Sequence, residues 1–139
     1  RVKEDCDFVA IHDAARPCLR RDDLDLLFDR LDADPVGGLL AVPVSDTLKQ
    51  SSPSGQVVAT VPRDGLWRAL TPQMFRFGLL RRALALCLER DRAVTDEASA
   101  VESLGLQPRL LRGRADNIKV TGPEDAALAE AILARSAAH

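Results

Sequence analysis

The sequence lacks the features that define several common protein classes. Its three cysteines, Cys6, Cys18 and Cys87, are an odd number without metal-ligand spacing, and one of its two histidines is the terminal His139. A disulfide scaffold and a protein-bound zinc ion are therefore not expected. No apolar run approaches the ~20 residues of a membrane span, and residues 1–7 have no signal-peptide layout. These absences predict a cytoplasmic protein.

A strong charge of either sign is also absent. The formal net charge of -2 provides no broad positive field, so we expect no nucleic-acid partner, and any bound anion must be held locally. Sixteen of the 19 basic residues are arginine, which suits two-pronged contacts with phosphate. A general bias of the sequence towards Arg, Ala and Leu is the simpler explanation for any single arginine. With 46% hydrophobic residues, the 139-residue chain is expected to fold as a single domain, residues 1–139.

Short apolar segments alternate with helical patterns along the chain. Strands are expected at 8–11, 39–44, 110–111 and 118–120, and helices at 22–34, 77–88, 95–105 and 125–135. This alternation predicts a Rossmann-like α/β fold, in which a mostly parallel sheet has helices on its faces. Such folds begin with a strand, a glycine-rich phosphate-binding loop and a helix. No such unit precedes Phe8, so we expect that part to lie outside this sequence.

Residues 45–63 follow a different pattern. Two short polar segments flank five turn-forming residues, 51–55, which predicts a β-hairpin. The hairpin has few large apolar residues, and isolated two-stranded ribbons are marginally stable in water. We therefore expect it to protrude as an arm and to rest on something else, such as a second subunit. Thr47 and Arg63 flank its base and could reach one ligand together, although ordinary hairpin surface also explains them.

The strongest local signal is the sequence His-Asp-Ala-Ala-Arg-Pro directly after the first expected strand. Ligands bind at the carboxyl ends of strands in open α/β sheets. The small residues Ala14 and Ala15 would let a ligand approach the backbone closely. Asp13 offers an acceptor, and Arg16 offers a planar fork for phosphate, although such a pair can also be purely structural. His12 is more simply explained as a hydrogen-bonded residue than as a catalyst.

Three later residues are further candidates, and Lys119 is the strongest of them. Thr71 and Thr95 stand at expected helix starts, where capping explains them without any ligand. Lys119 lies in an expected apolar strand, where a cation needs an anionic partner such as a substrate phosphate. There is no nucleophile elbow and no metal-binding histidine cluster, so covalent catalysis is not expected. A phosphate monoester acting as nucleophile would need mainly positioning and charge neutralisation.

Five separated segments together resemble one enzyme family. In order and spacing they are similar to the 2-C-methyl-D-erythritol 4-phosphate cytidylyltransferases, and they cover essentially the whole chain. These segments are 8–17, 46–49, 65–67 with 70–73, 95–99, and 113–121. The resemblance implies a nucleotidyltransferase that joins CTP and methylerythritol phosphate to give CDP-methylerythritol and pyrophosphate in non-mevalonate isoprenoid biosynthesis. Two alternatives stay open, namely a ribitol 5-phosphate cytidylyltransferase and a non-catalytic sugar-phosphate-binding or dimerisation module.

The resemblance also implies roles for individual residues. Arg63 and Lys119 would position the methylerythritol phosphate for attack on the α-phosphate of CTP. Asp13 would hold substrate hydroxyls. The implied substrate-binding set is Asp13, Arg16, Thr47, Thr71 and Thr95, with Ala14 and Ala15 on the cofactor-binding, nucleotide side.

Three further expectations follow from the same resemblance. The arm at 45–63 would cross to a partner subunit of a homodimer, so that Thr47 and Arg63 enter the neighbour's site. Mg²⁺ would be held mainly by the nucleotide phosphates, without a metal ligand from this chain. Because the family's glycine-rich CTP loop lies outside the sequence, the chain alone is expected to be inactive.

Overall fold

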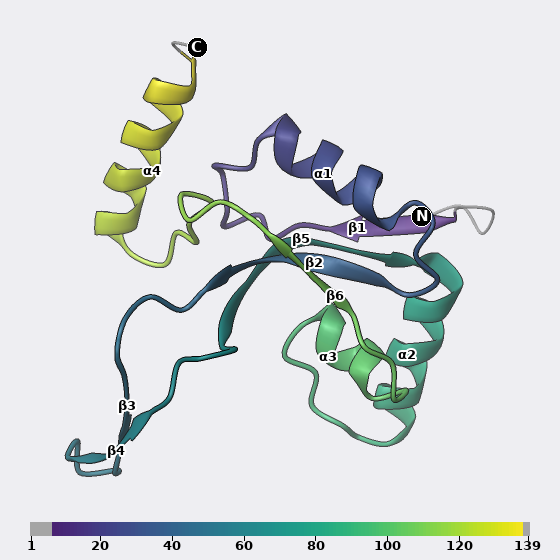
Figure 1. Cartoon of the computed structure of the whole chain (residues 1–139), viewed down its shortest axis with the longest axis horizontal. Helices are drawn as coiled ribbons and strands as arrows, with labels where there is room; N and C mark the ends of the chain where they lie inside the picture. Colours follow the sequence, from purple (N-terminus) through teal and green to yellow (C-terminus); the bar gives the residue numbers. More distant parts are fainter. Residues whose placement is uncertain (1–6, 138–139) are drawn as a thin grey trace.

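The computed structural model describes residues 7–137, so Cys6 and His139 lie outside the described part. It confirms an α/β fold with a sheet and flanking helices (Figure 1). The elements in chain order are β1 (Phe8–Ile11), α1 (Arg21–Leu31), β2 (Gly37–Pro43), β3 (Leu48–Ser51), β4 (Val57–Val61), β5 (Trp67–Arg76), α2 (Phe77–Glu89), α3 (Glu97–Glu102), β6 (Arg109–Arg112) and α4 (Pro123–Ala137).

The main sheet is mixed rather than mostly parallel. Its four described strands lie in the order β1-β5-β2-β6. β5 runs antiparallel to both β1 and β2, and the pair β2–β6 is parallel. The expectation of a mostly parallel sheet was wrong because β5, which the sequence patterns did not predict, lies between β1 and β2. The strands β1, β2 and β6 nevertheless point the same way.

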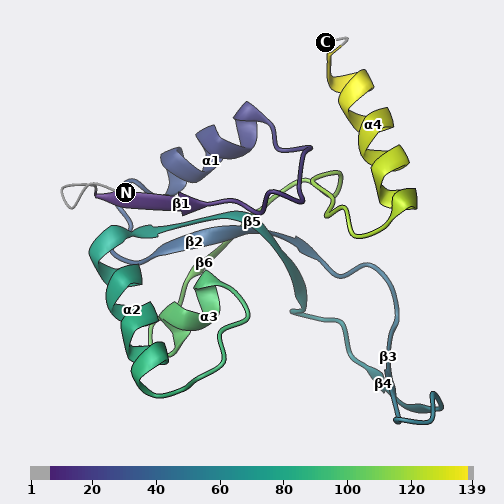
Figure 2. The ribbon, with the colours of Figure 1, turned by 180° about the vertical axis from the view of Figure 1, so that it is seen from behind.

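Helices cover both faces of this sheet. α1 lies on one face, and α2 and α3 lie on the other (Figures 1 and 2). Neighbouring residues of β2 alternate between the two cores: Leu39 packs with α2 and α3, and Leu40 packs with α1. Phe75 and Met74 of β5 alternate in the same way, and both are fully buried. This double coverage explains why β2 reads as a continuous apolar run.

Strand β5 passes through a segment that we expected to begin a helix. Thr71 and Pro72 resemble a helix start, since proline suits the first helical turn. In the structure Pro72 lies where the β2–β5 pairing shifts register, between Gln73 opposite Leu39 and Ala69 opposite Ala41. Proline has no amide hydrogen to give to a ladder, so irregular positions of this kind accommodate it.

The β-hairpin arm is confirmed. β3 and β4 pair antiparallel as a separate two-stranded sheet that projects away from the rest of the molecule (Figure 1). Almost all of its side chains are exposed, including Val57 at 66% and Val58 at 63%. Hydrophobic burial within this chain therefore contributes little to holding the arm in place.

The segment between β6 and α4 is a loop, so the strand expected at 118–120 was wrong. Its apolar side chains, Ile118 and Val120, pack against a small cluster that includes Cys18 and Ile132 rather than against a strand. α4 then begins at Pro123, and the Asp125 carboxylate accepts hydrogen bonds from the Thr121 amide and hydroxyl and from the Gly122 amide.

Candidate functional site

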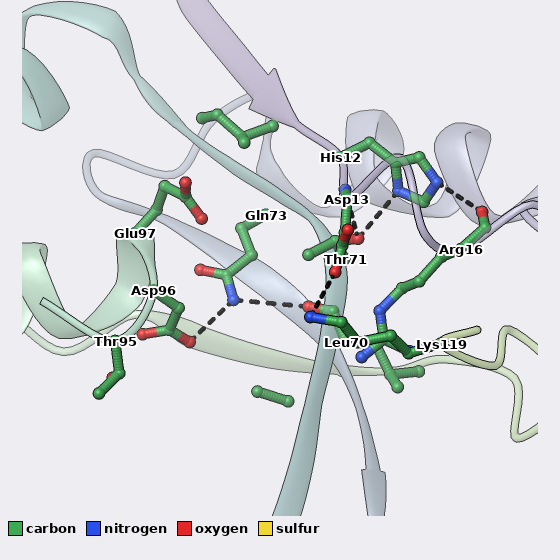
Figure 3. Close-up of a pocket in the computed structure, with 12 residues that line it drawn as sticks. His12, Asp13, Arg16, Leu70, Thr71, Gln73, Thr95, Asp96, Glu97 and Lys119 are labelled. Carbon is green, nitrogen blue, oxygen red and sulfur yellow. Dashed lines mark hydrogen bonds and ion pairs between the residues drawn. The ribbon is translucent and has the colours of Figure 1, made fainter. Parts of the chain in front are cut away.

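A pocket of about 440 Å³ opens at the carboxyl end of β1, next to the middle of β5 (Figure 3). Four regions far apart in the sequence build it: the end of β1 with the loop after it, strand β5, the start of α3, and the loop before α4. The lining residues are Ile11, His12, Asp13, Arg16, Ala69, Leu70, Thr71, Gln73, Thr95, Asp96, Glu97 and Lys119. Of the residues predicted from the sequence, the pocket brings together Asp13, Arg16, Thr71, Thr95 and Lys119.

An ion pair joins two of these residues across the pocket. Lys119 Nζ lies 2.9 Å from Asp13 Oδ2. The other carboxylate oxygen, Asp13 Oδ1, accepts from the Ala15 amide at 3.0 Å. The hydrogen bond from Lys119, followed by the one from Ala15, holds the pKa of the Asp13 carboxyl below its ordinary value of 3.8. Asp13 is therefore an ionised acceptor at neutral pH.

The surroundings of Lys119 differ from the expected ones. We expected an apolar strand in which the cation would await a phosphate. The residue instead belongs to a loop, its side chain is 51% exposed, and Asp13 already neutralises it. A phosphate that bound Lys119 would have to share it with Asp13 or displace Asp13 from it.

The loop before α4, which carries Lys119, also contacts Arg16. Its guanidinium Nη1 donates to the backbone carbonyl of Asn117 at 2.8 Å, and its amide donates to the Asp13 carbonyl at 2.9 Å. Burial lowers the pKa of the Arg16 guanidinium. An arginine side chain stays charged at neutral pH all the same. Arg16 and Lys119 thus give this end of the pocket two cations for one carboxylate, Asp13.

The other end of the pocket is acidic and is fixed by a residue that the sequence did not single out. Gln73, 1% exposed in β5, donates to Asp96 Oδ2 at 2.9 Å and accepts from the Ala98 amide at 2.8 Å. Asp96 Oδ1 accepts from the Ser99 amide, so Asp96 caps α3. The expected cap, Thr95, was wrong by one residue. Only the unpredicted strand β5 brings Gln73 to α3, so no local pattern identifies it.

His12 and Thr71 form the wall between the two ends. Thr71 Oγ1 accepts from the Asp13 amide at 3.0 Å and lies 2.9 Å from His12 Nδ1. The reading of His12 as a hydrogen-bonded residue agrees with these contacts. The fully buried Asn117 donates from Nδ2 to the Thr71 carbonyl at 2.7 Å, so it links this wall to the loop that carries Lys119.

Four of the predicted residues lie outside the lining of this pocket. Ala14 and Ala15 belong to the turn beside it, where the Ala15 carbonyl accepts from the Val120 amide at 2.8 Å. Thr47 and Arg63 are at the base of the arm, where the Arg63 guanidinium donates to the backbone carbonyl of Ser45. Their roles remain predictions.

Acidic side chains do not form a metal cluster in the described part of the chain. Among residues 7–137, no group of three or more His, Cys, Asp or Glu side chains is arranged to hold a metal ion. In the same range, no helix combines the length and the apolar character that crossing a membrane requires.

Comparison with known proteins identifies the family of this arrangement. The sequence model described as IspD: 2-C-methyl-D-erythritol 4-phosphate cytidylyltransferase matches residues 1–135. The enzyme of that name from Pseudomonas entomophila (strain L48) is 63% identical over 121 residues, which are 87% of this chain and 52% of the relative. Its counterpart from Dechloromonas aromatica (strain RCB) is 59% identical over 132 residues, covering 95% of this chain and 56% of the relative.

Solved structures agree with the sequence comparison. The crystal structure of 4-diphosphocytidyl-2C-methyl-D-erythritol synthase aligns with a TM-score of 0.82 at 51% identity, over 91% of this chain and 55% of that one. The Francisella tularensis 2-C-methyl-D-erythritol 4-phosphate cytidylyltransferase aligns with a TM-score of 0.85 at 36% identity, over 94% and 62%. The chain thus spans about half the length of the curated relatives it matches. It belongs to the IspD family, the 2-C-methyl-D-erythritol 4-phosphate cytidylyltransferases.

Proposed function

We propose that this chain supplies the sugar-phosphate-binding part of a cytidylyltransferase that converts CTP and 2-C-methyl-D-erythritol 4-phosphate to CDP-methylerythritol and pyrophosphate. Family membership supports the proposal. The observation that carries it is the two-ended pocket, which has Arg16 and Lys119 at one end and Asp96 and Glu97 at the other. A polyol with a phosphate at one end has the complementary distribution of charge and hydroxyl groups.

The chemistry of the pocket suits a phosphate nucleophile. A phosphate monoester is mostly dianionic near neutral pH, since its second pKa is about 6. Lys119 would bind this dianion and so release an oxygen of Asp13 to accept a substrate hydroxyl. A phosphate oxygen would then form a bond to the α-phosphorus of CTP as the bond to pyrophosphate breaks. Such a transfer needs positioning and charge neutralisation rather than a strong protein base.

CTP and Mg²⁺ are parts of the proposal for which this chain supplies few groups. In keeping with the family resemblance, we propose that the metal is held mainly through the nucleotide phosphates. When bound, it would neutralise charge on the phosphates undergoing transfer. Ala14 and Ala15 remain the candidates for close approach by the nucleotide.

The proposed compartment is the cytoplasm, whose reducing conditions suit the free thiols of Cys18 and Cys87.

We also propose that the arm acts across a homodimer, so that Thr47 and Arg63 complete a neighbour's pocket. Two observations support this proposal: the arm projects away from the sheet, and neither residue lines the pocket of its own chain (Figure 1). The exposed valines Val57 and Val58 would be covered by the partner. An isolated ribbon would gain from that coverage the stability that it lacks on its own.

The reaction is tested with the full-length protein as its gene encodes it. Pyrophosphate release is measured with CTP and Mg²⁺ and with either methylerythritol phosphate or ribitol 5-phosphate. We expect turnover with methylerythritol phosphate, and kcat/KM at least tenfold lower with ribitol 5-phosphate. A preference for ribitol 5-phosphate would mean that ribitol 5-phosphate, and not methylerythritol phosphate, is the substrate. Binding of either sugar phosphate without turnover would favour a non-catalytic binding module.

Complementation tests the arm. At methylerythritol phosphate concentrations well below KM, Arg63→Ala and Lys119→Ala homodimers are each expected to keep only about 1–10% of wild-type activity, the loss from one charged hydrogen bond. Mixed dimers formed by co-expression hold one intact site, made from the pocket of the first chain and the arm of the second. Random mixing makes about half of the dimers mixed, so about a quarter of wild-type activity should return. If the arm served its own chain, no mixed site would be intact and no activity would return.

A further inference from the structure

His12 makes a different contact with each ring nitrogen. Nε2 lies 2.9 Å from the backbone carbonyl of Arg16, and Nδ1 lies 2.9 Å from the Thr71 hydroxyl (Figure 3). The first contact ties the ring to its own loop. The second reaches across to β5 and to a residue that lines the pocket. The proposed function assigns no role to His12.

The carbonyl contact fixes the tautomer of the ring. A carbonyl oxygen can only accept, so His12 Nε2 must carry the hydrogen and donate it to Arg16. In the neutral imidazole Nδ1 is then an acceptor. In this neutral form, the hydrogen bond between His12 and Thr71 therefore runs from the Thr71 hydroxyl to Nδ1.

The same reasoning gives the polarity of Thr71. A hydroxyl has one hydrogen and two acceptor positions. The hydrogen is committed to His12, and one acceptor position is used by the Asp13 amide at 3.0 Å. What Thr71 can still offer a ligand in the pocket is a single acceptor position. Such a group receives a hydrogen bond from an alcohol and gives none to a phosphate.

A closed ring of hydrogen bonds fixes this arrangement. From Thr71 it continues through the Asn117 side chain, which donates to the Thr71 carbonyl at 2.7 Å. The Arg16 guanidinium donates to the Asn117 carbonyl at 2.8 Å, and the Arg16 carbonyl accepts from His12. Asn117 is fully buried, so the ring has a fixed point in the core. Because it joins three separate segments of the pocket wall, reorientation of one member disturbs the others.

We propose that His12 is a positioning residue that makes Thr71 a hydrogen-bond acceptor in the pocket, and that Thr71 thereby recognises a hydroxyl of the polyol rather than the phosphate. This inference rests on the proposed function and adds that different residues of the pocket recognise the phosphate and a hydroxyl of the substrate. Arg16 and Lys119 select the anionic end of the substrate, and the Thr71 oxygen selects an alcohol.

Two amide replacements separate the two contacts of His12. His12→Asn can place an amide oxygen where Nδ1 lies, and so keeps an acceptor for Thr71. His12→Gln can place an amide nitrogen where Nε2 lies, and so keeps the donor to Arg16. His12→Phe keeps neither contact and preserves a flat ring. The variants are compared in the full-length protein by steady-state kinetics, with thermal unfolding as the check that each one folds.

The expected order follows from the Thr71 contact. His12→Phe and His12→Gln should raise KM for methylerythritol phosphate about tenfold, the value of one misdirected hydrogen bond, with KM for CTP nearly unchanged. His12→Asn should be the mildest of the three variants, because it keeps the Thr71 contact and loses only the bond to Arg16. If His12 only fastens its loop through Arg16, His12→Gln is the variant that retains activity and His12→Asn loses it. That order would overturn the inference.

A double-mutant cycle tests the route through Thr71. In a Thr71→Val background the hydroxyl is gone, so His12→Phe should have little further effect on KM for the sugar phosphate. Full additivity of the two changes would overturn the inference. A wild-type protein inactive with every sugar phosphate would instead contradict the proposed function.

A spectroscopic readout does not depend on turnover. The imidazole ¹⁵N spectrum of the full-length protein should show His12 with its hydrogen on Nε2, and Thr71→Val should shift Nδ1 more than Nε2. A hydrogen on Nδ1 would overturn the inference even if the enzyme were fully active.

Discussion

The pocket and the arm are held in opposite ways. Around the pocket, the central strands are buried on both faces, the buried Gln73 side chain donates to Asp96, and the amide nitrogen of the buried Asn117 donates to the Thr71 carbonyl. In the arm, almost every side chain is exposed, and the two strands pair with each other alone in the described part of the chain. The pocket therefore derives its geometry from within the chain, whereas we expect the arm to depend on contacts beyond it. Substitutions in the two regions should accordingly affect different measurements.

The largest difference is expected for paired truncations of apolar side chains. Phe75→Ala removes a fully buried ring from the core and should lower the free energy of unfolding by about 3–5 kcal/mol. Val58→Ala, in the arm, should change it by less than about 0.5 kcal/mol at concentrations where the protein is monomeric. Denaturant titration of both variants measures this contrast. A large loss for Val58→Ala in the monomer would mean that the arm is packed within its own chain.

Two glycines provide a second pair. At Gly37 a Cβ would lie 2.2 Å from the Met74 carbonyl oxygen, and the backbone φ is +118°. Gly37→Ala should therefore cost about 2–3 kcal/mol of unfolding free energy, from both the clash and the strain. Gly55 in the arm turn has φ +81° but open space around it, so Gly55→Ala should cost only about 1 kcal/mol, from strain alone. Equal costs in denaturant titrations would contradict the contrast.

Arg63 should reverse the pattern, since a change there is expected to affect activity and leave stability intact. In the full-length enzyme, Arg63→Ala should raise KM for the sugar phosphate by about 10-fold to 100-fold, the range for one charged hydrogen bond. KM for CTP and the unfolding free energy should change little. Arg63→Lys should also be impaired, because a point charge does not replace a planar fork. Equal losses for both substrates would contradict the assignment of Arg63 to the sugar phosphate.

The smallest effect is a dependence on pH. The pKa of Asp13 is lowered in the folded protein, so its contribution to stability is present above the ordinary value of 3.8 and is lost as pH falls through the lower folded value. The difference in unfolding free energy between wild type and Asp13→Asn should therefore be constant from neutral pH to about pH 5 and should shrink below pH 4. A difference that grew on acidification would mean that Lys119 does not stabilise the charged carboxylate.

The sequence predicted the arm, most helices and the loop after β1 because each has a local cause. Turn residues define the arm, and helical spacing defines α1 and α2. Strand β5 could not be predicted in this way. Thr71 and Pro72 imitate a helix start, and the tolerance for Pro72 comes from a register shift against β2, which is a tertiary property.

The candidate site, like the fold, was predicted only in part from the sequence. Asp13 and Arg16 were recognised because they directly follow the apolar segment that forms β1. Lys119 was correctly expected in the pocket, but from a strand that the structure does not contain. Gln73 and Asn117 were not recognised as structural centres of the pocket. Their importance comes from burial and from partners 25 and 46 residues away in the sequence, which no short motif reveals.

The bond from Arg16 to Asn117 joins residues 101 positions apart. During synthesis, the β1 loop emerges from the ribosome long before the segment that completes the pocket. Closing so long a loop is entropically costly and slow relative to local helix formation. Until then the Arg16 guanidinium lacks Asn117, and the Asp13 carboxylate lacks Lys119. A nascent chain that has released residues 45–63 but not residue 117 therefore holds both strands of the arm before the pocket takes the arrangement described above.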